Sequence, residues 1–89
     1  MDVVPGDIVY SIAGRDKDKY FVVVRTEDVY AYLCDGKKRK ADNPKKKKVK
    51  HLKTKIGHSM YLENKLLSGE KVTNTELRRE LDDYNQKED

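Results

Sequence analysis

Two short apolar runs near the start of the chain, Ile8–Ile12 and Tyr20–Val24, constrain its fold more than any other feature. Both are rich in β-branched and aromatic residues, which favour strands, and both are too short for a typical helix. The charged segment Gly14–Lys19 separates them, and a glycine at its start tolerates the positive φ of a sharp turn. The pattern predicts two strands, at about residues 7–13 and 20–25, joined by a tight charged loop.

Three further strands are expected, at about residues 29–34, 37–41 and 49–52. Asp35-Gly36 is a strong hairpin signal, because a type I′ turn needs positive φ at both central residues. The strand expected at Lys37–Ala41 is almost wholly basic, so we expect it at a sheet edge with its side chains in water. Lys45–Lys48 is expected to be a loop. Five short strands with tight turns predict a small closed barrel.

The last third of the chain changes to a helical period. Ser59 is a plausible N-cap for a helix over about residues 60–68. Thr73 and Glu76 fit a capping box at the start of a second helix, over about residues 74–85. Leu77, Leu81 and Tyr84 then fall on one stripe. This stripe either docks on the barrel, which we favour, or binds another protein.

Charge is distributed unevenly along the 89 residues, a length that makes one small domain. The chain has 20 basic and 16 acidic side chains, for a net charge of +4. The excess of positive charge lies before residue 57, whereas residues 57–89 are acidic overall. This asymmetry favours a polyanionic partner for the first part and a different role for the tail. We therefore expect a barrel over residues 1–56 and a helical extension, packed on or near it, over residues 57–89.

The strongest functional signal is a set of basic residues in loops and at the expected sheet edge. Candidate RNA-binding residues are Arg15, Lys17, Lys19, Lys37, Lys38, Arg39, Lys40, Lys45, Lys46, Lys47, Lys48, Lys50, Lys53 and Lys55. Lysine predominates, and it acts as a point charge rather than a planar fork. Readout of phosphates and shape is therefore favoured over base-by-base readout. The alternative is a solvated tract that serves solubility or localisation.

The first 55 residues resemble the KOW family. The resemblance rests on Gly6-Asp7, the two apolar runs, Gly14 and the basic loop that follows it, and it continues through Asp35-Gly36-Lys37, Asn43-Pro44-Lys45 and Lys50-His51-Leu52. The closest likeness is to KOW-bearing eukaryotic-type large-subunit ribosomal proteins and their small bacterial relatives. It implies a mainly β fold, a five-stranded SH3-like barrel, and binding to ribosomal RNA or the large ribosomal subunit. It also places His51 near RNA, although a partly buried strand histidine is an equal alternative.

The remaining reactive residues do not predict an enzyme. Cys34 is the only cysteine, which fits a reducing compartment, and it lies in an expected strand, so we interpret it as a buried inert thiol. Two histidines and one cysteine do not form a zinc-binding set. Four tyrosines are open to two interpretations, as surfaces for unpaired bases or, more commonly, as core or barrel-surface aromatics: Tyr10, Tyr20, Tyr30 and Tyr32.

Two functional hypotheses follow. The first is a non-catalytic, monomeric RNA-binding protein of ribosomal or ribosome-associated type, active in translation. The second is an adaptor that binds a protein of the transcription or translation machinery through its tail. No signal peptide or membrane-spanning run is evident in the sequence. We therefore expect a cytoplasmic protein without cofactor or metal.

Overall fold

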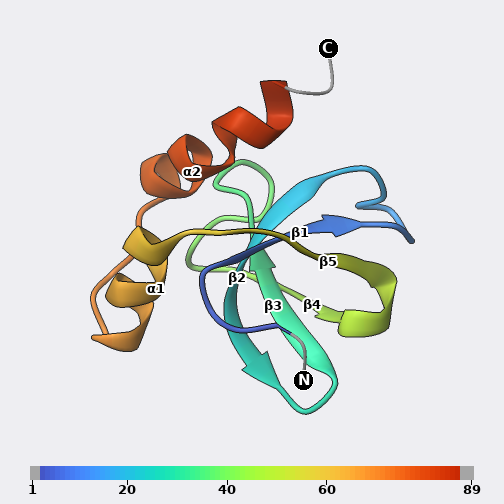
Figure 1. The fold of residues 1–89 in the computed structure, drawn as a ribbon, viewed down its shortest axis with the longest axis horizontal. Helices are drawn as coiled ribbons and strands as arrows, with labels where there is room; N and C mark the ends of the chain where they lie inside the picture. Colours follow the sequence, from blue (N-terminus) through green and yellow to red (C-terminus); the bar gives the residue numbers. More distant parts are fainter. Residues whose placement is uncertain (1–2, 87–89) are drawn as a thin grey trace.

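The computed structural model describes residues 3–86. Within these residues, five antiparallel strands form one sheet in the order β4-β3-β2-β1-β5, and two helices follow (Figure 1). The strands β1 to β5 span Asp7–Ser11, Tyr20–Glu27, Tyr30–Cys34, Lys45–Lys48 and Leu52–His58; the helices α1 and α2 span Met60–Leu67 and Asn74–Gln86. A mainly β domain with two C-terminal helices is therefore confirmed.

The two edge strands of the sheet are consecutive in the chain. Only the 3₁₀ turn Val49–His51, called η1, separates β4 from β5. Because an extended chain reaches only about 3.3–3.6 Å per residue, the sheet must curl until its edges approach each other at this turn. The turn is held from both sides: the Val49 amide donates to the Val29 carbonyl at 2.9 Å, and the Ile12 amide donates to the His51 carbonyl at 3.0 Å. The sheet is therefore strongly curled around an inner face.

The inner face of the curled sheet holds one apolar cluster. Val9 on β1, Phe21 and Val23 on β2, and Leu33 on β3 are all fully buried there, with Leu52 at the start of β5. Alternate residues of the first two strands point inward, as a pleated strand requires. This cluster packs the inside of the sheet.

The outer face of the sheet holds a second cluster, which the helices cover. Ile8 and Val22 lie on the strands, and Leu62 of α1 and Leu77 and Leu81 of α2 pack against them. Figure 1 shows both helices on the same side of the sheet. The α2 stripe therefore docks on the sheet, the alternative that we favour from the sequence. Apolar residues on both faces of β1 and β2 are explained by these two clusters.

Both helices begin as the sequence predicts. The Ser59 hydroxyl accepts a hydrogen bond from the Leu62 amide at 3.1 Å. At α2, the Thr73 hydroxyl accepts from the Glu76 amide at 3.2 Å, and the Glu76 carboxylate accepts from the Thr73 amide at 2.9 Å. The predicted capping box is thus confirmed. The same carboxylate accepts from the Lys65 ammonium at 2.7 Å, which ties α1 to α2.

The fourth strand is not where the sequence pattern places it. It is Lys45–Lys48, predicted to be a loop, whereas residues 37–41 are not a strand. The Asp35 carboxylate accepts hydrogen bonds from the amides of Lys37 and Arg39, at 2.8 and 2.9 Å. The Asp35 side chain thus accepts hydrogen bonds from loop amides that would otherwise pair with a facing strand, so these residues form a closed loop.

The fifth strand also differs from the prediction, since it begins at Leu52 and runs to His58. Val49 and Leu52 have opposite parity, so one continuous strand could not turn both inward. The η1 turn resolves this conflict, because both residues then pack against the inner cluster. Gly57 and His58 pair with Ile8 and Asp7 of β1, so the boundary expected after residue 56 falls inside a strand.

Candidate nucleic-acid interface

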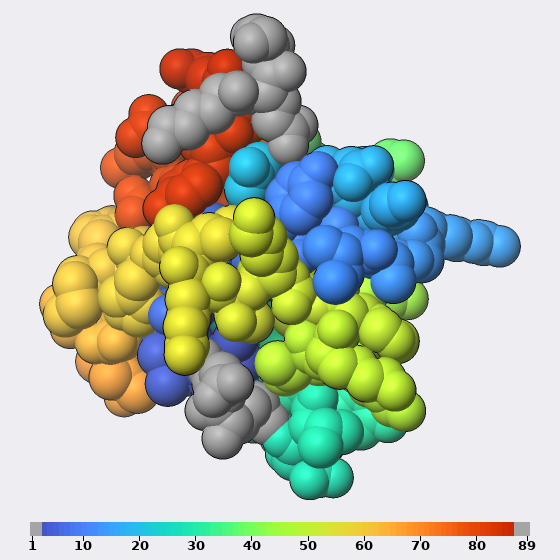
Figure 2. Space-filling view, turned by 45° about the vertical axis from the view of Figure 1, so that its right-hand side comes forward, coloured from blue at the N-terminus to red at the C-terminus, as the bar shows by residue number. Residues whose placement is uncertain are grey.

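The predicted basic residues come from three segments that the fold brings together: the β1–β2 loop (residues 12–19), the 35–40 loop, and the stretch from β4 to β5. Figure 2 shows the blue β1–β2 loop beside the yellow-green β4–β5 stretch on one face of the molecule. Their exposed members are Arg15, Lys17, Lys19, Lys37, Lys38, Lys40, Lys46, Lys48, Lys50, Lys53 and Lys55. We call these eleven residues the basic surface.

The β1–β2 loop owes its shape to backbone hydrogen bonds and two residues of positive φ, Gly14 at +81° and Asp18 at +69°. The Lys17 amide donates to the Gly14 carbonyl at 3.2 Å, and the Asp18 amide donates to the Ser11 carbonyl at 2.8 Å. These two bonds close the loop on itself. Its basic side chains Arg15, Lys17 and Lys19 are exposed.

An ion pair joins the β1–β2 loop to the 35–40 loop. Arg39 Nη2 lies 3.4 Å from the carboxylate of Asp16, which is 7% exposed as a residue. Arg39 is consequently half-buried and tied to a carboxylate, unlike its neighbours Lys37 and Lys38. The ion pair links the two basic loops through Arg39, and the role of Arg39 as a phosphate ligand stays a prediction.

The four lysines of β4 divide between the two faces of the sheet. Lys47 is opposite Ala31 in the register and points inward, where its ammonium donates to the Ser11 hydroxyl at 2.7 Å and to the Ala13 carbonyl. It is 9% exposed, so its charge is already engaged. Lys46 and Lys48 point outward, and Lys45 is half-buried.

The β5 side of the interface contains a bulge. Ile8 pairs with Gly57 but Tyr10 pairs with Lys53, so β5 carries extra residues in this interval. Lys55 lies within it, with a φ of +60°. A bulge redirects side chains away from the regular pleat, and Lys53 and Lys55 are both exposed. His51 is half-buried, but it lies in the η1 turn and not in a strand, and its proximity to RNA stays a prediction.

Several carboxylates close to the basic surface already have partners. Besides Asp16, Glu27 accepts the Tyr32 hydroxyl at 3.3 Å and lies 3.7 Å from Lys46 Nζ. Asp18 accepts the Tyr10 hydroxyl at 3.1 Å. The eleven residues of the basic surface outnumber these three carboxylates, so an approaching anion meets an excess of positive charge.

Tyrosines of the outer sheet face stand next to cations. The guanidinium of Arg25 lies 4.0 Å from the ring centroid of Tyr32, and the Lys46 ammonium lies 4.4 Å from that of Tyr30. Both rings are half-buried. The two tyrosines are thus surface aromatics of the sheet. Sequence reasoning missed Arg25, because its partner on β3 becomes evident only from the strand register.

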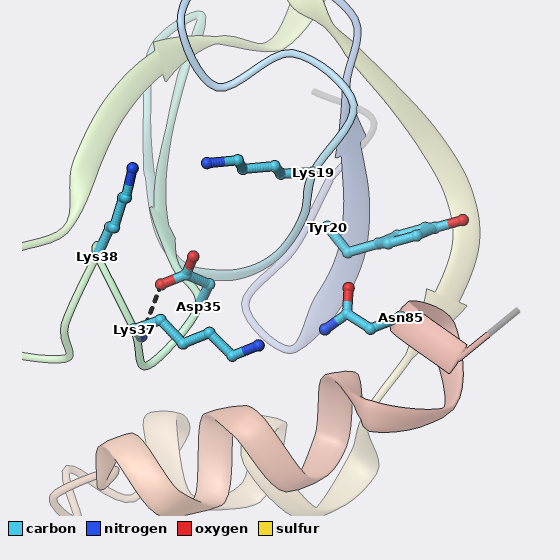
Figure 3. A pocket seen from close by; sticks show the side chains of 6 residues that line it. All are labelled: Lys19, Tyr20, Asp35, Lys37, Lys38 and Asn85. Carbon is cyan, nitrogen blue, oxygen red and sulfur yellow. Dashed lines mark hydrogen bonds between the residues drawn. The ribbon is translucent and has the colours of Figure 1, made fainter. Parts of the chain in front are cut away.

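A pocket of about 290 Å³ opens where the 35–40 loop meets α2 (Figure 3). Lys19, Lys37 and Lys38 line it, together with Tyr20, Asp35 and Asn85. In Figure 3, Lys19 and Lys38 extend into the space between the two basic loops, and Asp35 lies below them. Sequence reasoning did not place Asn85 here, because no local pattern indicates that the end of α2 returns to these loops.

Cys34 lies outside this surface and is buried against the outer cluster. Its thiol donates to the Lys40 carbonyl at 3.4 Å. Burial, reinforced by the nearby charges of Asp35 and Asp42, raises the pKa of the Cys34 thiol to about 12. The thiol is therefore protonated at neutral pH, which makes it a poor nucleophile and agrees with its interpretation as an inert core residue.

His58 forms a link that the sequence did not suggest. Its ring nitrogens lie 2.6 Å from an Asp7 oxygen and 2.9 Å from a Glu63 oxygen, so it joins β1 to α1.

Among residues 3–86, no group of three His, Cys, Asp or Glu side chains is placed to hold a metal ion. Over the same residues, neither helix is long and apolar enough to cross a membrane. Comparison with protein-family models and with curated protein sequences finds no match to this chain.

Proposed function

We propose that this protein is a non-catalytic RNA-binding protein of the KOW type, a small SH3-like barrel that binds ribosomal RNA through its phosphates. It acts in the cytoplasm as a ribosomal or ribosome-associated component. The observation that carries this proposal is the meeting of three basic segments at the β1–β2 loop. This loop lies beside the β4–β5 stretch (Figure 2) and is joined to the 35–40 loop by the Arg39–Asp16 ion pair.

The architecture supports the barrel assignment. A five-stranded antiparallel sheet whose edge strands are joined by one 3₁₀ turn has the curvature that a small barrel needs. The segments that resemble the KOW motif form β1, the β1–β2 loop and β2. Loops at one end of such a barrel offer adjustable contacts on a rigid base.

The electrostatics support a polyanion. Eleven exposed basic side chains repel one another, and binding of phosphates relieves this repulsion while releasing counterions from the nucleic acid. Folded RNA presents closely spaced phosphates and a shallow groove that loops can follow, without a helix that reads the major groove. The preference for RNA over DNA rests on the KOW resemblance, because charge alone does not separate the two.

Binding without catalysis fits the chemistry of the surface. Lysine ammonium groups attract phosphates. At neutral pH, however, neither the ammonium groups nor the protonated thiol of Cys34 can act as a nucleophile or a general base. The surface is therefore suited to holding RNA in a fixed shape.

Co-sedimentation with purified large ribosomal subunits, and with free ribosomal RNA, tests the proposal. We expect the bound fraction to fall as salt rises, with log affinity decreasing by about 0.7–0.9 per log unit of salt for each phosphate contact. The double variant Lys38→Gln/Lys48→Gln should bind less and with a salt slope smaller by about 2. The matched control Lys71→Gln/Arg79→Gln removes two exposed charges from the helical region and should bind like the wild type. A protein that stays in the supernatant even at low salt would contradict the proposal.

A second candidate function is the adaptor, and one observation favours it. Helix α1 exposes large apolar side chains, with Met60 at 59% and Leu67 at 71%. An adaptor would bind a protein of the transcription or translation machinery through this helix. In the same sedimentation assay it predicts binding that resists salt, is lost in Met60→Glu/Leu67→Glu, and is unchanged in the lysine double variant.

A further inference from the structure

A second hollow adjoins the pocket between the basic loops. It has a volume of about 550 Å³ and is lined by Tyr10 and Ile12 from the β1 side, Tyr20 of β2, Lys53 and Ile56 of β5, and Tyr84 of α2. Its volume lies within the roughly 300–1,000 Å³ of typical ligand sites. Tyr20 also lines the lysine pocket of Figure 3. Tyr20 therefore borders both hollows, which together we call the tyrosine groove.

The floor of the groove is aromatic. The ring centroids of Tyr10 and Tyr20 are 4.8 Å apart with an interplanar angle of 59°, and those of Tyr20 and Tyr84 are 5.6 Å apart at 47°. These tilted contacts hold three rings from three different elements side by side. Ile12, which is 49% exposed, adds apolar surface at the margin. Flat, apolar ligand groups are therefore favoured on this floor.

The margins of the groove are cationic. Lys53 stands at the tyrosine end, and Lys19, Lys37 and Lys38 stand at the other. Asp35 also lines the lysine end, but its carboxylate accepts hydrogen bonds from two backbone amides. The groove thus combines an aromatic floor with lysines at both ends, the two features by which proteins bind single-stranded nucleic acid.

We propose that the tyrosine groove binds an unpaired, single-stranded segment of RNA, with bases against the tyrosine rings and the adjoining phosphates on the lysines. This inference rests on the proposed RNA-binding function and adds to it a site for bases. Paired bases in a duplex are stacked inside the helix and do not reach such a floor. The site therefore selects single-stranded over double-stranded RNA but reads base identity weakly, because every base offers an aromatic face.

Fluorescence anisotropy tests the proposal. The labelled probes are oligouridine and oligoadenosine of roughly 10 nucleotides and an RNA duplex of equal length. We expect both single strands to bind more tightly than the duplex and to quench the intrinsic fluorescence of a chain that has six tyrosines and no tryptophan. Tyr20→Leu should weaken single-strand binding by about tenfold to a hundredfold and reduce the quenching. Tyr61→Leu changes an exposed tyrosine of α1 that lines neither hollow and should leave the single-strand affinity unchanged.

Circular dichroism would reveal whether Tyr20→Leu unfolds the protein. A second variant tests the groove independently of that substitution. Lys19→Gln/Lys53→Gln changes only exposed side chains, one at each end of the groove, and should lower single-strand affinity and its salt dependence. Equal binding of duplex and single strand, or unchanged affinity in both groove variants, would overturn the proposal. If large subunits pellet the protein while single strands do not bind, the groove proposal fails and the proposed function stands. If subunits do not pellet it, the proposed function fails in its own assay.

Discussion

The ammonium of Lys47 lies 2.7 Å from the Ser11 hydroxyl, inside the curled sheet and 36 residues away in the chain. A run of four lysines thus contains one side chain that belongs to the interior. Ser11 itself donates to the Ala13 carbonyl at 3.1 Å, which the Lys47 ammonium also approaches. This small polar network anchors edge strand β4 to the end of β1.

Removal of the Lys47 ammonium should destabilise the fold. We expect Lys47→Met, which keeps most of the aliphatic stem, to lower the free energy of unfolding by about 1.5–3 kcal/mol, the usual size for a hydrogen bond to a charged group. Urea denaturation measures this change. The control Lys46→Met alters a neighbouring side chain that is 47% exposed and should change stability by less than about 0.5 kcal/mol. Equal effects of the two substitutions would contradict an interior role for Lys47.

Substitution of Gly57 should loosen the contact between β5 and α2. A methyl group at this position would lie 1.8 Å from the Tyr84 hydroxyl oxygen, so the ring must move. We expect Gly57→Ala to cost about 1–3 kcal/mol of unfolding free energy, as overpacking does. Tyr84→Leu removes the obstructing ring, so the double variant should lose less than the sum of the two single variants. Strict additivity in urea denaturation would show that the two residues do not meet.

Stability should depend on pH through Glu76. Hydrogen bonds from the Lys65 ammonium, then from the Tyr61 hydroxyl and the Thr73 backbone, lower the pKa of the Glu76 carboxyl from 4.5 to about 2. A carboxyl whose pKa is lower in the folded state stabilises the protein above its unfolded pKa, and this contribution disappears as pH falls through the folded value. The loss should therefore occur between about pH 4.5 and pH 2.

The substitution Glu76→Gln isolates this contribution. Urea midpoints measured at about pH 6 and at low pH should differ less in this variant than in the wild type, because the charge that acid neutralises is already absent. Glu70→Gln, an exposed residue just before the capping box, should keep the wild-type pH dependence. An unchanged acid response in Glu76→Gln would assign the effect to other carboxylates.

Cys34 should resist thiol reagents in the folded protein. Its pKa is raised to about 12, chiefly by burial, and only the thiolate reacts. At about pH 8 we expect negligible modification by an aromatic disulfide reagent in buffer and rapid modification in urea. Fast labelling of the folded protein would show that the outer cluster opens readily at β3.

Local patterns in the sequence were sufficient for much of the fold. The caps at Ser59 and Thr73 and the stripe of Leu77 and Leu81 were predictable because their interactions span only a few residues. The first two strands were predictable from their composition. The exposure of most lysines was predictable because charged side chains are rarely buried without a partner. The groove was not predictable, because it joins β1, β2, β5 and α2.

What the sequence by itself determined is therefore the first three strands, the two helices and the charge along the chain, since these follow from short-range preferences and solvation. The tertiary structure decided which lysine points inward, where β4 lies, and how Asp35 is used. Asp35-Gly36 permits a hairpin, but its carboxylate binds loop amides instead, and Gly36 lies beneath α2, whose Arg78 donates to its carbonyl at 2.6 Å. These features depend on contacts between residues that are distant in sequence. The free energy of those packing contacts outweighs the local preference for a turn type.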